Sequence, residues 1–468
     1  MNRKILFLSA CAAALSVASC ATSNVKVETL AAEGAIHEYQ FSNGLKLLVK
    51  EDHRAPVVNS QVWYKVGSSY EHDGITGVSH VLEHMMFQGT TKHPPGEFSK
   101  IIAENGGSEN AFTGQDYTAY FQTLEKSRLE ISFALEADRM RNLRLQQTEF
   151  DKEIKVVMEE RRWRTDDKPE SVTYERLSAA AFLSSPYRIP VIGWMNDLEN
   201  IQLEDLRAWY ETWYAPNNAT LVVVGDVQPE EVKRLATKYF AQLKPSKIPA
   251  LKPRKEVEPL GVRNIEVRVP AQVPMLYMGY LVPSLASAKP QQDAYALEML
   301  ANVLDGGSSA RLSEELVRGK EIAANASAGY SLTSRLSDLF LLMGTPATGK
   351  SIAQLRAALL EQVERLKNTP ITKAELEKIK AQVVASAVYE KDSHFYQAMQ
   401  LGTYETIGLS WKDGEAYVSK IMAVTPEQVQ QVARKYLLKD HLVTAELVPL
   451  PMDPNKAPRP APTSGHHM

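Results

Sequence analysis

The stretch Gly77-Val78-Ser79-His80-Val81-Leu82-Glu83-His84-Met85-Met86-Phe87-Gln88-Gly89-Thr90 decides how this chain is organised. His80 and His84 are four residues apart and Glu83 follows His80 by three, so a helix would present all three on one side of about one turn. The residues between them are mostly apolar, which predicts a buried helix. Two neutral imidazoles suit a zinc ion, and a neighbouring carboxylate can take a proton from an activated water.

A pair of core histidines, hydrogen-bonded to backbone carbonyls, is the alternative explanation of this pattern, which also arises by chance. A third ligand would favour the metal site, and residues 125–165, rich in helix formers, contain candidate carboxylates. Glu153 and Glu160 are seven residues apart and share one helix face, whereas Glu159 points about 100° away. A carboxylate from this helix would complete a site of two histidines and one acid, although a solvent-exposed acidic face explains the same residues.

The length and composition indicate two domains and give no sign of nucleic-acid binding. The chain has 468 residues, of which 44% are hydrophobic. This exceeds one ordinary core and suffices for two domains of roughly 200 residues each. The net charge of −3 provides no basic surface, so we expect no nucleic-acid partner.

The N-terminus has the pattern of an export signal. Two basic residues, an apolar run and a small-residue end predict a cleaved signal peptide over residues 1–19 rather than a membrane span. The ending Val17-Ala18-Ser19-Cys20 resembles a bacterial lipobox, which implies a lipid on Cys20 and a protein anchored to the membrane in the bacterial periplasm. An ordinary signal with a chance cysteine is the alternative. The other cysteine, Cys11, lies in the same segment, so disulfides and thiol catalysis are excluded for the exported chain.

The remaining chain divides into segments of different composition. We expect a tether at 20–33, a catalytic zinc-binding domain at 34–245, a linker at 246–262, a second domain at 263–450 and a disordered tail at 451–468. The tether is small and polar, the linker contains several Pro and Lys, and the tail is rich in Pro and Ala.

The second domain repeats the pattern of the first. Thr425–Leu437 followed by Leu442–Val448 matches Leu203–Tyr214 followed by Ala219–Val224, at an offset of about 223 residues. The counterpart of the zinc helix, Leu297–Asn302, has no histidine. The second domain is therefore expected to bind no metal.

Strands are predicted on both sides of the zinc helix. Ile36–Phe41 and Leu45–Val49, joined through Asn-Gly, predict a hairpin, and Val57–Val66 predicts a strand that leads to the helix. Asn110–Leu124 alternates like one strand. Its first residues, Asn110-Ala111-Phe112-Thr113, could form an edge that pairs with an extended peptide, although a plain strand with one polar face explains them equally.

Several motifs together resemble the pitrilysin/insulinase family of zinc peptidases, in its short two-domain form, over roughly residues 35–450. These motifs are Gly77–Thr90, Glu104–Tyr120, Glu153–Glu160, Pro186–Trp194 and Tyr214–Val227. The resemblance implies an α+β fold of two similar domains. Each would be a mostly antiparallel sheet packed with helices, and the two would face each other across a closed chamber.

The resemblance also assigns roles to individual residues. It implies that one Zn²⁺ per chain is held by His80, His84 and Glu160, and that Glu83 is the general base. Glu153 would be a neighbouring acid that steadies the site. Asn110 and Ala111 would belong to the edge strand that holds the substrate.

One motif of the family is missing. Members that act alone carry an Arg and a Tyr seven residues apart in the second domain, where both contact substrate. Here Val317 and Ala324 stand in their places, and a shift by one residue restores Arg318 but brings Asn325 opposite the tyrosine. We therefore expect a homologous partner chain that supplies the Arg–Tyr pair, or alternatively a homodimer.

The expected activity is that of a zinc metalloendopeptidase acting on short extended peptides or unfolded segments, as the metal-bearing subunit of a two-chain enzyme. A non-catalytic scaffold subunit and a lipid-anchored peptide-binding protein are the alternatives from other classes. The presence of every ligand and of the base argues against a scaffold.

Overall fold

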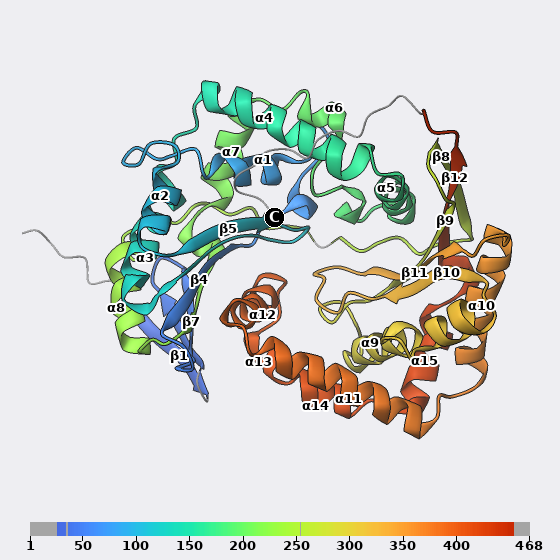
Figure 1. Ribbon diagram of the computed structural model, residues 1–468. Helices are drawn as coiled ribbons and strands as arrows, with labels where there is room; N and C mark the ends of the chain where they lie inside the picture. The colour runs from blue at the N-terminus through green and yellow to red at the C-terminus, as the bar shows by residue number, and fades with distance from the viewer. Residues whose placement is uncertain (1–25, 34–35, 253, 454–468) are drawn as a thin grey trace, which may run out of the picture.

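The computed structural model describes residues 26–33, 36–252 and 254–453 as two α+β halves, each built on one sheet (Figure 1). The first half contains strands β1 (Val27–Glu33), β2 (Ile36–Phe41), β3 (Lys46–Glu51), β4 (Val57–Tyr64), β5 (Ser108–Thr113), β6 (Thr118–Glu125) and β7 (Ala219–Gly225). The second contains β8 (Arg263–Pro270), β9 (Met275–Val282), β10 (Ala323–Gly329), β11 (Asp338–Pro346) and β12 (Leu442–Leu450).

Helices cover both sheets. Those of the first half are α1 (Val78–Met85), α2 (Glu97–Glu104), α3 (Leu129–Asn142), α4 (Gln147–Arg161), α5 (Pro169–Ala181), α6 (Met195–Leu198), α7 (Leu203–Trp213) and α8 (Pro229–Phe240). Those of the second half are α9 (Gln292–Asp305), α10 (Ile352–Asn368), α11 (Lys373–Glu390), α12 (His394–Thr406), α13 (Trp411–Glu415), α14 (Tyr417–Met422) and α15 (Pro426–Tyr436).

The five strands of the second sheet follow the same order as the last five of the seven strands in the first. The first is β1-β2-β3-β7-β4-β6-β5 and the second, read from its other end, is β8-β12-β9-β11-β10. β3 and β7 pair in parallel, as do β8 and β12, whereas the other described pairs are antiparallel. The expected α+β class with two similar, mostly antiparallel sheets is therefore confirmed. The repeat of α7–β7 by α15–β12 is part of this duplication.

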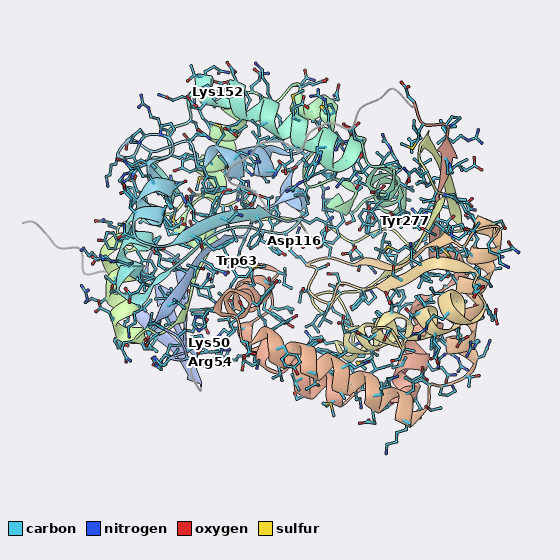
Figure 2. All side chains as sticks on the ribbon, in the orientation of Figure 1. Lys50, Arg54, Trp63, Asp116, Lys152 and Tyr277 are labelled. Carbon is cyan, nitrogen blue, oxygen red and sulfur yellow. The ribbon has the colours of Figure 1, made fainter. Side chains whose placement is uncertain are left out.

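Each half lends one helix to the other (Figure 1). Helix α5 packs on the second sheet, where Arg263 of β8 donates hydrogen bonds to the carbonyls of Ala180 at 2.6 Å and Ala181 at 2.9 Å. Helix α12 packs on the first sheet, where buried Trp63 of β4 joins Ala398, Leu401 and Trp411 in one apolar cluster. Trp63 is labelled beside α12 in Figure 2. The two halves are thus interlocked.

Two segments differ from expectation. Part of the expected tether forms β1, which pairs antiparallel with β2, because Val27 to Thr29 alternates and continues the sheet edge. The run expected as one strand from Asn110 to Leu124 is the β5–β6 hairpin, because residues 114–117 turn the chain. The residues expected to form the signal peptide, with Cys11 and Cys20, lie outside the described residues, as do residues 454–468. In the part of the chain that the structure describes, no helix combines the length and apolarity needed to cross a bilayer.

Candidate metal centre

Helix α1 is buried along its whole length and is fixed at its first turn by an acid from outside the helix. Glu71 accepts hydrogen bonds from the backbone N–H groups of Gly77 at 2.7 Å and Ser79 at 2.9 Å. These donors would otherwise be unsatisfied at a helix N-terminus, where negative charge is also favoured. Burial raises the pKa of Glu71 to about 7, against these hydrogen bonds, which lower it.

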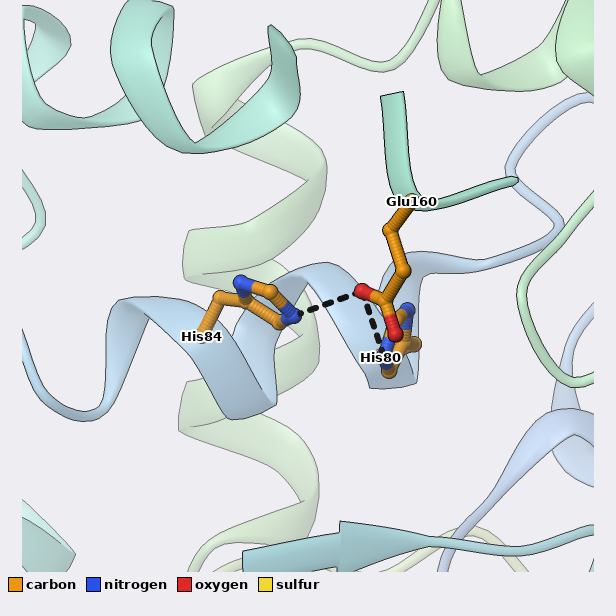
Figure 3. A group of neighbouring side chains, drawn as sticks. All are labelled: His80, His84 and Glu160. Atoms are coloured by element: carbon orange, nitrogen blue, oxygen red, sulfur yellow. Dashed lines mark ion pairs between the residues drawn. The ribbon is translucent and has the colours of Figure 1, made fainter. Parts of the chain in front are cut away.

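Three side chains from α1 and α4 converge on one point (Figure 3). His84 Nε2 lies 3.3 Å and His80 Nε2 lies 3.7 Å from the same oxygen of Glu160, Oε2. Candidate ligand atoms of all three residues lie within 4.8 Å of one another, and all three residues are buried. Ligands of a tetrahedral zinc at about 2.0–2.1 Å are separated by about 3.3 Å. The 3.3 Å distance matches this value and the 3.7 Å distance is close to it, and two imidazoles with one carboxylate are a donor set that suits this metal.

The structure shows which of the three glutamates considered from the sequence is placed to bind a metal. Glu160 faces the histidines, whereas Glu159 is exposed and pairs with Arg162. Glu153, two turns before Glu160, lies on the far side of His84, with its Oε2 at 3.3 Å from Nδ1, and accepts a hydrogen bond from Gln88 at 2.8 Å. When Nδ1 donates to Glu153, Nε2 is left to face the site.

The acids around His84 change its protonation. Burial lowers the pKa of His84, but its hydrogen bonds with Glu153 and Glu160 outweigh burial and raise the pKa to about 9. Burial raises the pKa of Glu160, but the hydrogen bond from His84 and the charges of the two histidines and Arg164 bring it to about 2. Without a metal, His84 and Glu160 therefore form an ion pair at neutral pH.

Glu83 lies on α1 beside a cavity of about 750 Å³. Its Oε2 accepts a hydrogen bond from the hydroxyl of Thr113 on β5. His80, Glu160, Ala111 and Thr113 line the same cavity, and the second half contributes Tyr277 and Met343. The metal centre therefore opens into a space bounded by both halves.

The two residues expected to hold substrate lie on β5, at the edge of the first sheet. Ala111 lines the cavity, and its N–H donates to the side chain of Asn110 at 2.8 Å. Sequence reasoning placed Thr113 in the same edge as Ala111 but missed its contact with Glu83, although alternation puts Thr113 and Ala111 on one face of the strand. Arg318, Ala324 and Asn325 are exposed, and none of the four residues compared with the Arg–Tyr pair lines the cavity.

Comparisons with known proteins agree with this site. Residues 46–193 match the model of "Insulinase (Peptidase family M16)", and residues 200–383 match "Peptidase M16 inactive domain". The zinc protease PqqE of Helicobacter pylori is 35% identical over 361 residues, covering 75% of this chain and 79% of that protein. The mitochondrial-processing peptidase subunit beta of Lentinula edodes is 25% identical over 408 residues, covering 85% of this chain and 86% of that subunit.

A solved structure extends the likeness to the whole fold. The crystal structure of a protease from Helicobacter pylori has a TM-score of 0.83 and 31% identity, and it covers 91% of this chain and 100% of that one. Sequence and fold thus agree with the buried His-His-Glu cluster at the cavity wall. The chain therefore belongs to the insulinase family, peptidase family M16, and is a zinc metalloprotease of that family.

Proposed function

We propose that this protease cleaves short extended peptides or unfolded segments, with Zn²⁺ held by His80, His84 and Glu160 and with Glu83 as general base. The observation that carries the proposal is the meeting of two imidazoles and one carboxylate at the wall of a cavity that the carboxylate of Glu83 also lines. A zinc ion bound there would polarise the scissile carbonyl and lower the pKa of a water molecule.

The chain's own residues supply proton transfer and orientation. Glu83 takes the proton of the attacking water on its carboxylate and delivers it to the departing amine nitrogen. Thr113 holds Oε2 of Glu83, and Glu153 holds Nδ1 of His84. Both contacts fix side chains that would otherwise rotate.

The shape of the site supports an extended substrate. β5 is an edge strand, and an extended peptide can add to such an edge through main-chain hydrogen bonds, with Asn110 and Ala111 on the receiving strand. A cavity of about 750 Å³ is the size of a small-ligand site, so it admits a few residues of peptide and no folded domain.

We further propose that a second chain completes the enzyme. The Arg–Tyr pair is missing, and one hydrogen-bond donor to a developing oxyanion contributes about 2.7–4 kcal/mol, at least a hundredfold in rate. Relatives of similar length are named as beta subunits of a processing peptidase, which supports an assembly. A homologous partner supplying the pair is favoured over a homodimer, because two copies would both lack it.

The location is also proposed from the N-terminus. Cys20 at the end of a lipobox-like signal supports a lipid-anchored protein of the bacterial periplasm. Cys20→Ala should move the protein from the membrane fraction to the soluble fraction of its own cells. Unchanged partitioning would exclude the anchor.

The activity is tested with the protein purified from its own membrane, with and without any co-purifying chain. Zinc content is measured by elemental analysis, and cleavage is followed with a quenched fluorescent peptide that has no folded structure. Glu83→Gln should keep zinc and lose cleavage by about 10²–10⁴-fold, while His84→Ala should lose both. Glu159→Gln is the matched control, because Glu159 is adjacent to a ligand in sequence but exposed.

The outcomes separate the proposals. Zinc-dependent cleavage that persists in Glu83→Gln would exclude the base. Cleavage at ordinary peptidase rates by the single chain would exclude the need for a partner.

A further inference from the structure

Arg335 of the second half places its guanidinium group against the first half, beside the cavity. Arg335 lies in the turn between β10 and β11, and its Nε and its backbone N–H each donate to the carboxylate of Asp116 at 3.0 Å. Its terminal nitrogen donates to the hydroxyl of Ser69 at 2.7 Å, and the guanidinium carbon lies 4.6 Å from the ring centre of Tyr70. A single residue of the second half thus makes four contacts with the first.

Asp116 is the centre of this contact and lies at the boundary of the two halves (Figure 2). It is 4% exposed and also accepts hydrogen bonds from Ser69 at 2.8 Å and from the hydroxyl of Tyr187. A buried carboxylate is unfavourable unless it is paired and hydrogen-bonded. Arg335 supplies the paired cation, so the second half provides the charge that this position requires.

The Asp116 cluster, defined as Ser69, Asp116, Tyr187 and Arg335, joins segments that build the active site. The N–H of Ser69 donates to the carbonyl of Gln115 at 2.8 Å, and the N–H of Leu336 donates to the Tyr187 hydroxyl at 3.1 Å. Gln115 and Tyr187 line the cavity. The cluster therefore reaches the cavity wall through Tyr187 and supports the neighbouring residue Gln115.

The cluster is also close in sequence to both parts of the proposed mechanism. Asp116 follows Thr113, the last residue of β5, by three residues, and Thr113 contacts Glu83. Ser69 precedes by two residues Glu71, which caps the metal-bearing helix. A shift of the cluster would move the edge strand relative to α1.

We propose that Arg335 is a positioning residue of the peptidase: its ion pair with Asp116 holds the edge strand β5 in register with the metal-bearing helix. The second half, in which the structure describes no cluster of metal-ligating side chains, would then contribute to substrate binding through the position of β5. This inference rests on the proposed function, in which β5 receives the peptide.

Loss of the ion pair between Arg335 and Asp116 should weaken peptide binding more than it slows the chemical step. Without the guanidinium, the 114–117 turn and the end of β5 gain backbone freedom, which the peptide must remove again on binding. Re-ordering about one residue corresponds to about a tenfold rise in KM. The metal ligands lie on α1 and α4, outside the cluster, so zinc content should stay constant.

The test compares Arg335→Gln, Arg335→Lys and the double variant Asp116→Asn with Arg335→Gln. The double variant removes both charges, so no unpaired buried carboxylate threatens the fold. Arg311→Gln is the control, because Arg311 makes a two-point ion pair with Glu375 within the second half, at 2.8 and 2.9 Å. Each zinc-loaded protein, with any co-purifying chain, is assayed for KM and kcat on the unfolded peptide.

We expect KM to rise about tenfold in Arg335→Gln and in the double variant, with kcat within about threefold. Arg335→Lys should recover part of the loss, and Arg311→Gln should match the wild type. Amide hydrogen exchange of residues 108–118 should accelerate in the two Arg335→Gln proteins and not in Arg311→Gln.

Wild-type KM together with wild-type exchange at 108–118 in a folded double variant would overturn the role of Arg335. Failure of the proposed function gives a different result, because the wild type itself would then lack zinc-dependent cleavage. The hydrogen-exchange measurement would still test, in that case, whether the Arg335–Asp116 ion pair holds β5 in place.

Discussion

Zinc binding should depend steeply on pH, because the site holds a proton that the metal must displace. In the metal-free protein His84 lies between two acids, with Nδ1 at 3.3 Å from Glu153 and Nε2 at 3.3 Å from Glu160. These contacts raise its pKa to about 9, so at pH 7 the ring is an imidazolium. Zinc binds the neutral imidazole, and this proton must leave on binding.

The magnitude follows from that pKa. Below pH 9 the apparent zinc affinity should fall about tenfold for each pH unit, or about a hundredfold from pH 9 to pH 7. This difference corresponds to about 2.7 kcal/mol. Glu160, whose pKa is about 2, is already a carboxylate in this range and adds no further dependence.

The stability of the metal-free protein should change in the opposite direction. The pKa of His84 is raised from its ordinary value of 6.5 to about 9 in the folded state. The stabilisation is therefore fully present below pH 6.5 and is lost as the pH rises through 9. The loss is on the order of 3 kcal/mol. Urea unfolding of chelator-treated protein across this range measures it.

The assay removes zinc with a chelator and titrates it back from pH 6.5 to 9.5 against a chromophoric competitor calibrated at each pH. Calorimetry in buffers of different ionisation enthalpy counts the released protons. Release of one proton at pH 7 and of half a proton near pH 9 is the expected result. An affinity that is constant within about threefold over this range would refute the ion pair of His84 with its acids.

Two further substitutions test the support of the metal site and the packing of α12. Glu153→Gln removes the acid behind His84 and should weaken zinc binding by about 10–100-fold, read in the same competition assay at pH 9.5, where the proton that Glu153 helps His84 to hold competes little with zinc. Unchanged affinity at that pH would exclude its supporting role. Gly402→Ala places a methyl group 2.1 Å from Cε2 of buried Trp63, so the free energy of unfolding should fall by about 1–3 kcal/mol despite the better helix propensity of alanine. An unchanged urea midpoint would show that α12 can move away from the sheet.

The metal-bearing helix could be predicted from sequence because its information is local. Spacing alone places His80, Glu83 and His84 on one face of a helix, and apolar neighbours indicate burial. Neighbouring residues in the sequence do not determine which of Glu153, Glu159 and Glu160 is the metal ligand. Helical phase puts the first and last on one face, but the packing of α4 across α1 decides which reaches Nε2 and which reaches Nδ1.

Features that depend on the meeting of the two halves could not be predicted in this way. Tyr277 and Met343 line the cavity although they lie in the second half, away from the metal-binding motif, and nothing in their own neighbourhood marks them. Arg335 has no motif around it, and its partner Asp116 is 219 residues away in sequence. The turn at Gly114 was hidden because the alternation of apolar residues continues on both sides of it.

Because α5 and α12 each pack on the sheet of the opposite half, neither half is expected to fold when it is expressed alone. Residues 34–245 expressed alone would expose Trp63 and the apolar face of β4 and β7, while α5 would have no sheet to cover. The duplicated halves therefore cannot behave as separable modules. Denaturation should proceed as one cooperative event, and a destabilising change in either half should lower the melting temperature of the entire chain.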